Sequence, residues 1–309
     1  MNSFITILCI LFSFISYAQT PNNISNDILS VKTNKHVNIP GTRVFVIPPI
    51  GFTVSKTYPA IEKRDEVIVQ SLDLIGGSFY TNAATFSKEK FEKKGIKVFE
   101  YKEFKINNFP AKMAFVQGEP AAKVYNLVFG DSTFSAMIMG VFATNDHTTG
   151  EQIKNAIQSV YYDKTFVINP FAAANFKLDD SKSIFKFAKY SASMYVYSID
   201  GIKKDSYDKD PYLMVSTLSN QGAALQHTAD DIASVLKNGI IKNNSTAKTN
   251  GYPSLKREIC GKLNGKDAVL FQHLVSIGQH TIIMQGIADD NFEKYIVEFQ
   301  KLSNTINKK

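Results

Sequence analysis

The second half of this chain repeats the order of sequence features found in its first half. An Asn-Asn-Phe-Pro turn at 107–110 precedes two apolar runs, and an Asn-Gly-Tyr-Pro turn at 250–253 precedes two more. The runs cover 124–129 and 136–141 in the first half, and 269–274 and 281–287 in the second. Because such self-similarity indicates a repeated structural unit, we predict two copies of one domain.

The N-terminal residues have the composition of a secretion signal. Met1–Ala18 contains no charged side chain, and its apolar run from Phe4 to Ile15 is shorter than the roughly 20 residues of a transmembrane helix. Ser16 and Ala18 have the spacing of a signal-peptidase site. We therefore expect a secreted or periplasmic protein, cleaved after Ala18 and without a transmembrane segment thereafter. An uncleaved anchor is the alternative, because no basic side chain precedes the run.

Composition also suggests where the two domains begin and end. Residues 19–38 are rich in Asn, Ser and Lys, which predicts a flexible leader. Asn169-Pro170 is a linker signal, so we expect the first domain over 39–166 and the second over 171–309. Domains of about 130 residues can be held together by a hydrophobic core alone.

Short strands separated by a few amphipathic helices predict an α+β fold. Ser87 begins one helix, a capping box at Thr149 begins another, and Thr228 begins a third that reaches Ile240. A closing helix starts near Asp290. Strands are expected within 43–54, 67–72, 78–80, 175–178, 184–190, 194–198 and 212–216. The fold class is therefore two consecutive α-β-α domains, each an antiparallel sheet flanked by helices.

This order of elements resembles the MOG1/PsbP-like superfamily. The resemblance includes the turns Asn108-Phe109-Pro110 and Asn250-Gly251-Tyr252-Pro253, the glycine that ends the following meander, and the closing amphipathic helix. It implies an antiparallel sheet between helices, present twice over almost the whole mature chain. Members of the superfamily are binding or assembly factors, in photosystem association or in regulation of a small GTPase. Neither role carries over, because no partner-binding motif can be matched residue by residue.

The positive charge of the chain is dispersed. The formal net charge is +7, but the lysines lie among acids, and the densest cluster, Lys88–Lys94, includes Glu89 and Glu92. This pattern is typical of the solvated face of a helix, whereas a nucleic-acid site gathers basic side chains into one patch. We therefore predict no nucleic-acid partner.

The histidines do not form a metal site in the sequence pattern. His36, His147, His227, His273 and His280 have no counterparts in the other copy. Antiparallel pairing across Gly278 would set His280 opposite about Ser276, away from His273, so we expect satisfied strand or surface histidines. No metal or other cofactor is expected.

A hydrolase is the least favoured function. Gly130-Asp131-Ser132, with His147 later in the chain, lacks the strand-to-helix setting of a nucleophile elbow and predicts a hairpin turn.

Three aspartates and the cysteines also favour a structural role over a functional site. Asp205, Asp208 and Asp210 miss the spacing and central glycine of a calcium loop, which leaves weak calcium binding open. After signal cleavage removes Cys9, Cys260 is the only thiol, so no intrachain disulfide can form and a buried, inert thiol is expected.

Tyrosines provide the candidate partner-binding surface. Two adjacent strands carry Tyr190, Tyr195 and Tyr197, and the first copy ends with Tyr161-Tyr162. Exposed tyrosines are enriched at interfaces because they bring a large area with a polar tip. We therefore predict a secreted, non-enzymatic binding or assembly protein that acts on another protein or on the cell envelope. A carrier of a small apolar or acidic ligand is the alternative, and any site should belong to one copy or to their junction.

Overall fold

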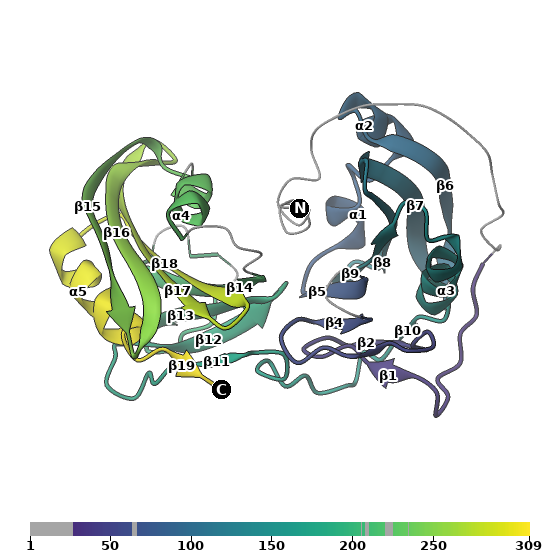
Figure 1. Cartoon of the computed structure of the whole chain (residues 1–309), viewed down its shortest axis with the longest axis horizontal. Helices are drawn as coiled ribbons and strands as arrows, with labels where there is room; N and C mark the ends of the chain where they lie inside the picture. The colour runs from purple at the N-terminus through teal and green to yellow at the C-terminus, as the bar shows by residue number, and fades with distance from the viewer. Residues whose placement is uncertain (1–26, 64–66, 205, 208–209, 220–224, 234) are drawn as a thin grey trace. The chain divides into compact units, whose positions relative to one another are not determined.

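The structure of the chain, a computed structural model, is described here in two units that divide after Ala173 (Figure 1). The described residues are 27–63, 67–204, 206–207, 210–219, 225–233 and 235–309.

The first unit is built on a seven-stranded antiparallel sheet in the order β3-β4-β5-β9-β8-β7-β6. Its strands are β3 (Thr53–Val54), β4 (Ala60–Glu62), β5 (Ile68–Ile75), β6 (Lys97–Ile106), β7 (Phe109–Glu119), β8 (Ala122–Gly130) and β9 (Phe134–Ala143). The helices are α1 (Phe79–Asn82), α2 (Lys88–Lys93) and α3 (His147–Gln158). A three-stranded sheet joins β1 (Val37–Asn38), β2 (Val44–Val46) and β10 (Tyr161–Tyr162).

The second unit has the same strand order, β12-β13-β14-β18-β17-β16-β15. Its strands are β12 (Phe185–Ser191), β13 (Met194–Ile199), β14 (Tyr212–Ser219), β15 (Lys237–Thr249), β16 (Tyr252–Leu263), β17 (Lys266–Ile277) and β18 (His280–Ala288). The helices are α4 (Leu225–Ala233) and α5 (Phe292–Ser303), and β11 (Phe176–Lys177) pairs with β19 (Asn307–Lys308). Each strand of one large sheet has a counterpart in the other, which confirms the predicted duplication and the α+β class.

The glycine of the repeated pattern allows the closing helix to approach the sheet. Gly140 on β9 lies beneath α3, where an added Cβ would overlap Ile153. Gly286 on β18 lies beneath α5, where an added Cβ would overlap the ring of Phe299. The two copies therefore keep glycine here for the same packing reason.

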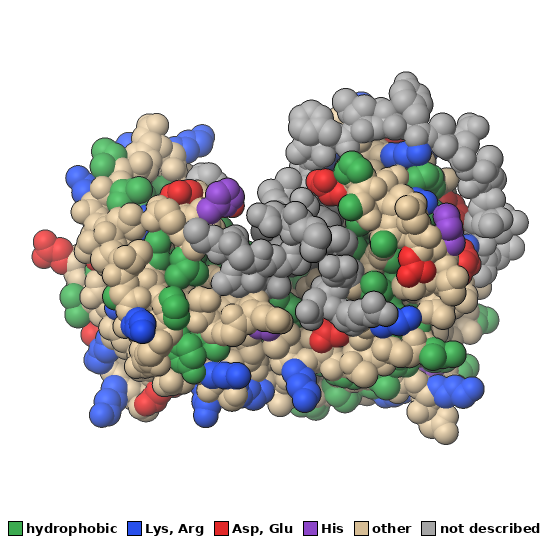
Figure 2. Space-filling model, in the orientation of Figure 1, with side chains coloured by type: hydrophobic (Ala, Val, Ile, Leu, Met, Phe, Trp, Pro, Cys, Tyr) green, Lys and Arg blue, Asp and Glu red, His purple; other side chains and the backbone are tan. Residues whose placement is uncertain are grey.

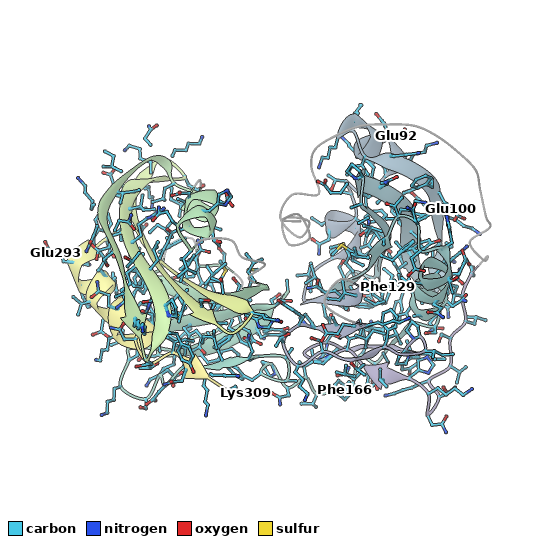
Figure 3. All side chains as sticks on the ribbon, viewed as in Figure 1. Glu92, Glu100, Phe129, Phe166, Glu293 and Lys309 are labelled. Atoms are coloured by element: carbon cyan, nitrogen blue, oxygen red, sulfur yellow. The ribbon has the colours of Figure 1, made fainter. Side chains whose placement is uncertain are left out.

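Each core lies mainly between the large sheet and this closing helix. In the first domain, Phe129 points into the interior and is fully buried (Figure 3). In the second, the Phe299 ring stacks between those of Phe185 and Phe271, at centroid distances of 4.9 and 6.1 Å. Helix α4 packs on the opposite face of the second sheet, against Leu255 among other apolar residues.

Asparagine and glycine shape the repeated hairpin turns. Asn107 and Asn108 have φ of 48° and 70° between β6 and β7, and Asn250 and Gly251 have φ of 49° and 85° between β15 and β16. Positive φ at both central residues is the geometry of the two-residue turn that suits twisted strands. The turns predicted at both positions are present.

Three expectations for the helices need correction. Asp146, not Thr149, caps α3, because its carboxylate accepts a hydrogen bond from the Thr149 amide at 3.0 Å. Residues 78–80 belong to the start of helix α1, where the Phe79 amide donates to Asp131 O at 2.8 Å, and not to a strand. The third helix runs from Leu225 to Ala233, so Thr228 lies inside it and does not begin it, and Ile240 lies in β15 opposite Cys260.

The described part of the predicted leader, residues 27–38, is attached to the first domain. Ile28 forms a parallel bridge with Ile106 at the end of β6, and Ser30 Oγ donates to Ser159 O at 2.9 Å. Lys32 Nζ lies 3.1 Å from Asp163 Oδ2, and residues 37–38 form β1. Order in the first domain therefore begins before residue 39, because hydrogen bonds to the sheet edge hold a polar segment that its composition alone would leave flexible.

Candidate functional site

The predicted tyrosine surface is mostly part of the core. The exposed fractions of Tyr195, Tyr197 and Tyr162 are only 4%, 2% and 6%. Tyr195 makes an edge contact with Phe176 at 5.1 Å and lies 4.9 Å from the Tyr190 ring. Since buried rings cannot meet a partner, only Tyr161 and Tyr190, which are half-buried, offer some of their surface.

Tyr162 instead belongs to a buried polar pair that ties β10 to β5. Its hydroxyl donates to Asp73 Oδ1 at 2.9 Å, and the Arg43 amide donates to Asp73 Oδ2 at 2.8 Å. Burial raises the pKa of Asp73 above its ordinary value, against the opposing effect of these hydrogen bonds. Stacking of Tyr162 on Phe134 at 4.0 Å completes a structural cluster.

The residues of the hydrolase hypothesis lie apart. Ser132 is in the turn before β9 and His147 begins α3 after it, so the ten residues of β9 separate them by about 30 Å at roughly 3.3 Å each. Desolvation opposes ionisation of Asp131, but hydrogen bonds from Lys164 and Thr133 outweigh it and lower the pKa of Asp131 to about 2. Asp131 therefore acts in the predicted turn between β8 and β9.

His273 is a buried histidine with both ring nitrogens in hydrogen-bond contact. Its Nε2 lies 3.0 Å from Thr249 Oγ1 and its Nδ1 lies 2.9 Å from Ser303 Oγ. Burial, with a smaller effect of Lys256, lowers the pKa of His273 to about 3. His280 pairs with Ile277, one residue from the predicted register. Within the described residues, no group of three or more His, Cys, Asp or Glu side chains could hold a metal ion.

The calcium hypothesis and the expected buried thiol are the remaining candidates from the sequence. Asp205 and Asp208 of the calcium hypothesis are not among the described residues, while Asp210 Oδ2 lies 2.7 Å from Lys204 Nζ. Cys260 on β16 is half-buried and not fully buried as expected.

A row of side chains crosses four neighbouring strands at the same place in both domains. Within it, Asn126 and Gln272 are 2% and 0% exposed, and the amide group of Asn126 and Oε1 of Gln272 have no hydrogen-bond partner in the described parts of the chain. Unpaired buried amides cost about 1–3 kcal/mol each, so both positions mark places where water or a ligand would be stabilising. The rows are Gln70, Met139, Asn126, Ala114 and Met214, Gln285, Gln272, Arg257.

Arg257 distinguishes the second row. Its side chain is fully buried, with Nη1 2.8 Å from Asp230 Oδ1, and Asp230 on α4 is itself 57% exposed. Its Nε and Nη2 have no hydrogen-bond partner among the described residues. Apolar clusters that include Leu255 and Ile259 flank it. This guanidinium edge suits a carboxylate or phosphate, and Ala114 provides no such charge in the first domain. Aligning the two repeats reveals Asn126 and Gln272, but not that Arg257 is buried.

Strand β15 leaves one edge of the second sheet exposed. It pairs with β16 only, and every residue from Lys237 to Lys248 is exposed, including Ile240 at 61% and Ile241 at 49%. Thr249 opposite Tyr252 closes the hairpin, so alternate residues before it, beginning with Lys248, direct their amide and carbonyl groups away from β16. In the described part of the chain, no other strand pairs with this edge.

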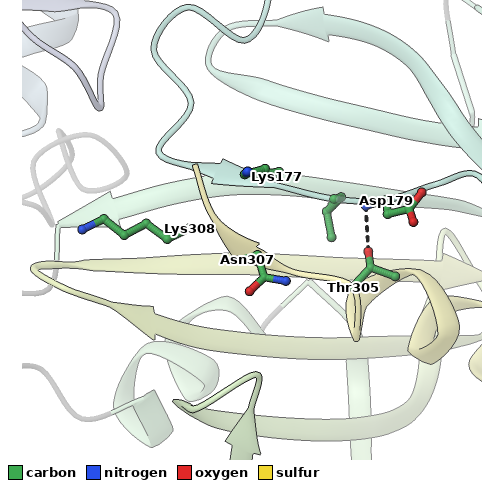
Figure 4. Close-up of a pocket in the computed structure, with 6 residues that line it drawn as sticks. Lys177, Asp179, Thr305, Asn307 and Lys308 are labelled. Carbon is green, nitrogen blue, oxygen red and sulfur yellow. Dashed lines mark hydrogen bonds between the residues drawn. The ribbon is translucent and has the colours of Figure 1, made fainter.

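A shallow pocket lies beside the short sheet of the second domain. It has a volume of about 490 Å³ and is lined by Lys177, Leu178, Asp179, Thr305, Asn307 and Lys308 (Figure 4). The Asp179 amide donates to Thr305 Oγ1 at 2.9 Å across it. None of its lining residues is buried, so it has no buried polar group directed inward, which makes it the weaker candidate.

Charged side chains of both signs lie on the face that Figure 2 shows, where lysine and arginine side chains are spread over the surface and acidic ones lie among them in places. The predicted solvated helix is α2, which has no buried residue and carries ion pairs from Lys88 to Glu92 and from Lys93 to Glu89. None of the helices in the described ranges is long and apolar enough to cross a membrane.

No protein-family model matches this chain, and no curated protein matches it. Solved structures that match include the cyanobacterial PsbP of Synechocystis sp. PCC 6803, at 11% identity over 48% of this chain and 98% of that chain, with a TM-score of 0.28. A PsbP protein, from the superfamily that the sequence resembles, is thus among the similar structures.

Two further solved structures come from bacterial proteins. LpqN, involved in cell envelope biogenesis of Mycobacterium tuberculosis, is 16% identical over 43% of this chain and 79% of that chain, with a TM-score of 0.29. The immunity protein TplEi of the T6SS of Pseudomonas aeruginosa is 8% identical over 89% of this chain and 97% of that chain, with a TM-score of 0.31. At these identities and TM-scores the matches assign no function to this chain.

Proposed function

We propose that this protein is a secreted, non-enzymatic binding protein that acts on another protein of the cell envelope or the extracellular space. The observation that carries this function is the open edge of β15, which is exposed from Lys237 to Lys248. An open strand edge binds an extended segment of another protein through main-chain hydrogen bonds.

The sequence of β15 favours a foreign partner over another copy of the same strand. Lys237, Lys242 and Lys248 lie on it and no acidic residue does, so two copies would bring like charges together. The register also shifts twice along the pairing with β16. Lysines and irregular pairing are features by which sheet edges avoid self-association. The exposed Ile240 and Ile241 still provide apolar surface for a partner.

Site-specific crosslinking tests this function. A photo-crosslinking amino acid at Ser245 on β15 should give a specific adduct with an envelope or secreted protein. The same amino acid at Val297, which is 60% exposed on α5, is the matched control and should not give that adduct. No adduct from Ser245, or the same adducts from both positions, would contradict a binding function at this edge.

Arg257 supports a second candidate function, a carrier of a small ligand with an acidic group. Among the described residues, Nε and Nη2 of the buried guanidinium have no hydrogen-bond partner and could donate to a carboxylate, and Oε1 of Gln272 opposite it has none either. Native mass spectrometry of freshly purified protein should then show an added mass that denaturation releases. Arg257→Lys keeps the charge but loses the paired N–H donors of the guanidinium, so it should lower ligand occupancy. Lys262→Arg on the surface is the control and should leave the occupancy unchanged. Wild-type protein without added mass would exclude a retained ligand.

A further inference from the structure

The first domain shows what a bound segment looks like on the edge of this sheet. Ile28 N donates to Lys105 O at 2.7 Å, and Ile28 O accepts from the Asn107 amide at 2.8 Å, which places Ile28 parallel to the end of β6. The preceding residue, Asp27, accepts from the Lys105 amide through its Oδ1 at 2.9 Å. An acidic residue followed by an apolar one therefore satisfies three outward backbone groups of the edge.

The second domain presents the same edge without such a segment in the described part of the chain. Lys248 lies opposite Pro253 next to the hairpin turn, as Lys105 lies opposite Pro110 in the first domain. Asn250 is the first residue of its hairpin turn, as Asn107 is in the first domain, so the two backbone amides occupy corresponding positions. The side chain of Asn250 donates to Asn304 O and Ile306 O. The backbone amide and carbonyl of Lys248 and the amide of Asn250 match the groups that bind Asp27 and Ile28.

We propose that β15 binds an extended segment of another protein in which an acidic residue precedes an apolar one, running parallel to β15. This inference rests on the proposed function and specifies the chemistry of the partner. The apolar residue bridges Lys248 O and the Asn250 amide, and the acidic side chain accepts from the Lys248 amide.

Charge on the edge favours the same occupant. Lys248 is at the docking position, and Lys242 lies on the same exposed strand, which carries no carboxylate. Attraction of an acidic segment would be partly screened by salt, so affinity should fall as ionic strength rises. The leader of the chain already fills the corresponding edge of β6, which leaves β15 as the open position for an added peptide.

A synthetic peptide with the sequence of residues 27–33 is the probe, measured by fluorescence anisotropy with the mature protein. It should bind, and its Asp27→Asn version should bind about tenfold more weakly, because a charged hydrogen bond is lost. Lys248→Pro removes the outward amide without affecting pairing to Pro253 and should abolish binding, whereas Lys248→Gln keeps the amide and should retain most of it. Methylating the Ile28 nitrogen of the peptide makes the same test without altering the protein.

Equal binding by Lys248→Pro and Lys248→Gln, or full binding of the methylated peptide, would overturn the inference. Formation of a dimer in sedimentation, lost in Lys248→Pro, would also overturn it by identifying the occupant as a second copy. An adduct from Ser245 that the peptide does not displace would leave the proposed function standing while the partner chemistry fails. If the peptide binds specifically but Ser245 gives no adduct, the partner chemistry stands and the proposed function fails.

Discussion

Substitution of Gly140 by alanine tests the packing that the two domains share. The added Cβ would overlap Ile153 Cγ2 and lie 3.1 Å from Ile157 Cδ1, and both isoleucines are fully buried. The φ of Gly140 is not in the left-handed region, so the cost comes from crowding and not from backbone strain. Overpacking of a dense core costs about 1–3 kcal/mol. Gly140→Ala should therefore lower the free energy of unfolding by that amount.

Urea unfolding followed by far-UV circular dichroism measures this cost, since the chain has no tryptophan to report by fluorescence. With an m-value of about 2 kcal/mol per molar urea, the midpoint of the first domain should fall by about 0.5–1.5 M. Gly118→Ala on β7 is the matched control, because nothing lies within 4 Å of its added Cβ, and it should be neutral or slightly stabilising. If Gly140→Ala costs no more than Gly118→Ala, the close approach of α3 is wrong.

Three further changes have defined outcomes. Because the pKa of His273 is lowered to about 3 in the folded protein, the unfolded chain binds a proton at a higher pH than the folded chain does. The free energy of unfolding should therefore fall as the pH drops from about 6.5 towards 3. Urea titrations at several pH values should show a smaller fall for His273→Gln. Asn250→Ala loses two hydrogen bonds and places alanine at a φ of 49°, which should cost about 1–3 kcal/mol, whereas a loss below about 0.5 kcal/mol would contradict the turn geometry. N-terminal sequencing of exported protein should begin at Gln19, and a retained Met1 would refute cleavage.

The parts of the fold that the sequence predicts are those set by local chemistry. Asn250-Gly251 adopts positive φ at both residues, as a two-residue hairpin turn needs. Ser87 caps α2 by accepting from the Lys90 amide at 3.3 Å, as its position before a helical run predicts. Gly286 recurs because a helix crosses directly above it. Each of these signals is a residue type whose geometry depends on its immediate neighbours.

Periodicity misled the prediction where tertiary pairing replaced a helix. Ile232, Leu236 and Ile240 have helical spacing, yet α4 ends at Ala233 and Asn238 adopts a φ of 54°. From Lys237 onward the chain pairs with β16 along the whole of β15, and these pairing hydrogen bonds outweigh an amphipathic pattern of only three residues.

Burial of particular polar and aromatic residues could not be predicted either. Alternation along a strand indicates which residues share a face, but not which element covers that face. Arg257 is a charged residue in an alternating strand and would be expected in solvent, yet α4 covers it. Tyr195 and Tyr197 looked like a surface for a partner, yet they lie in the core.

Amide hydrogen exchange along β15, read residue by residue by NMR, tests the central claim that this edge binds the partner. In the free protein the outward amides of Asn244, Thr246 and Lys248 should exchange rapidly, while those of Ser245 and Ala247, which face β16, should be protected. On addition of the crosslinked partner or the acidic peptide, the amides of Lys248 and Asn250 should become protected, as the contacts of Asp27 and Ile28 on the first sheet predict. Amides of Lys248 and Asn250 that are already slow in the free protein, or that remain fast in the complex, would contradict the account.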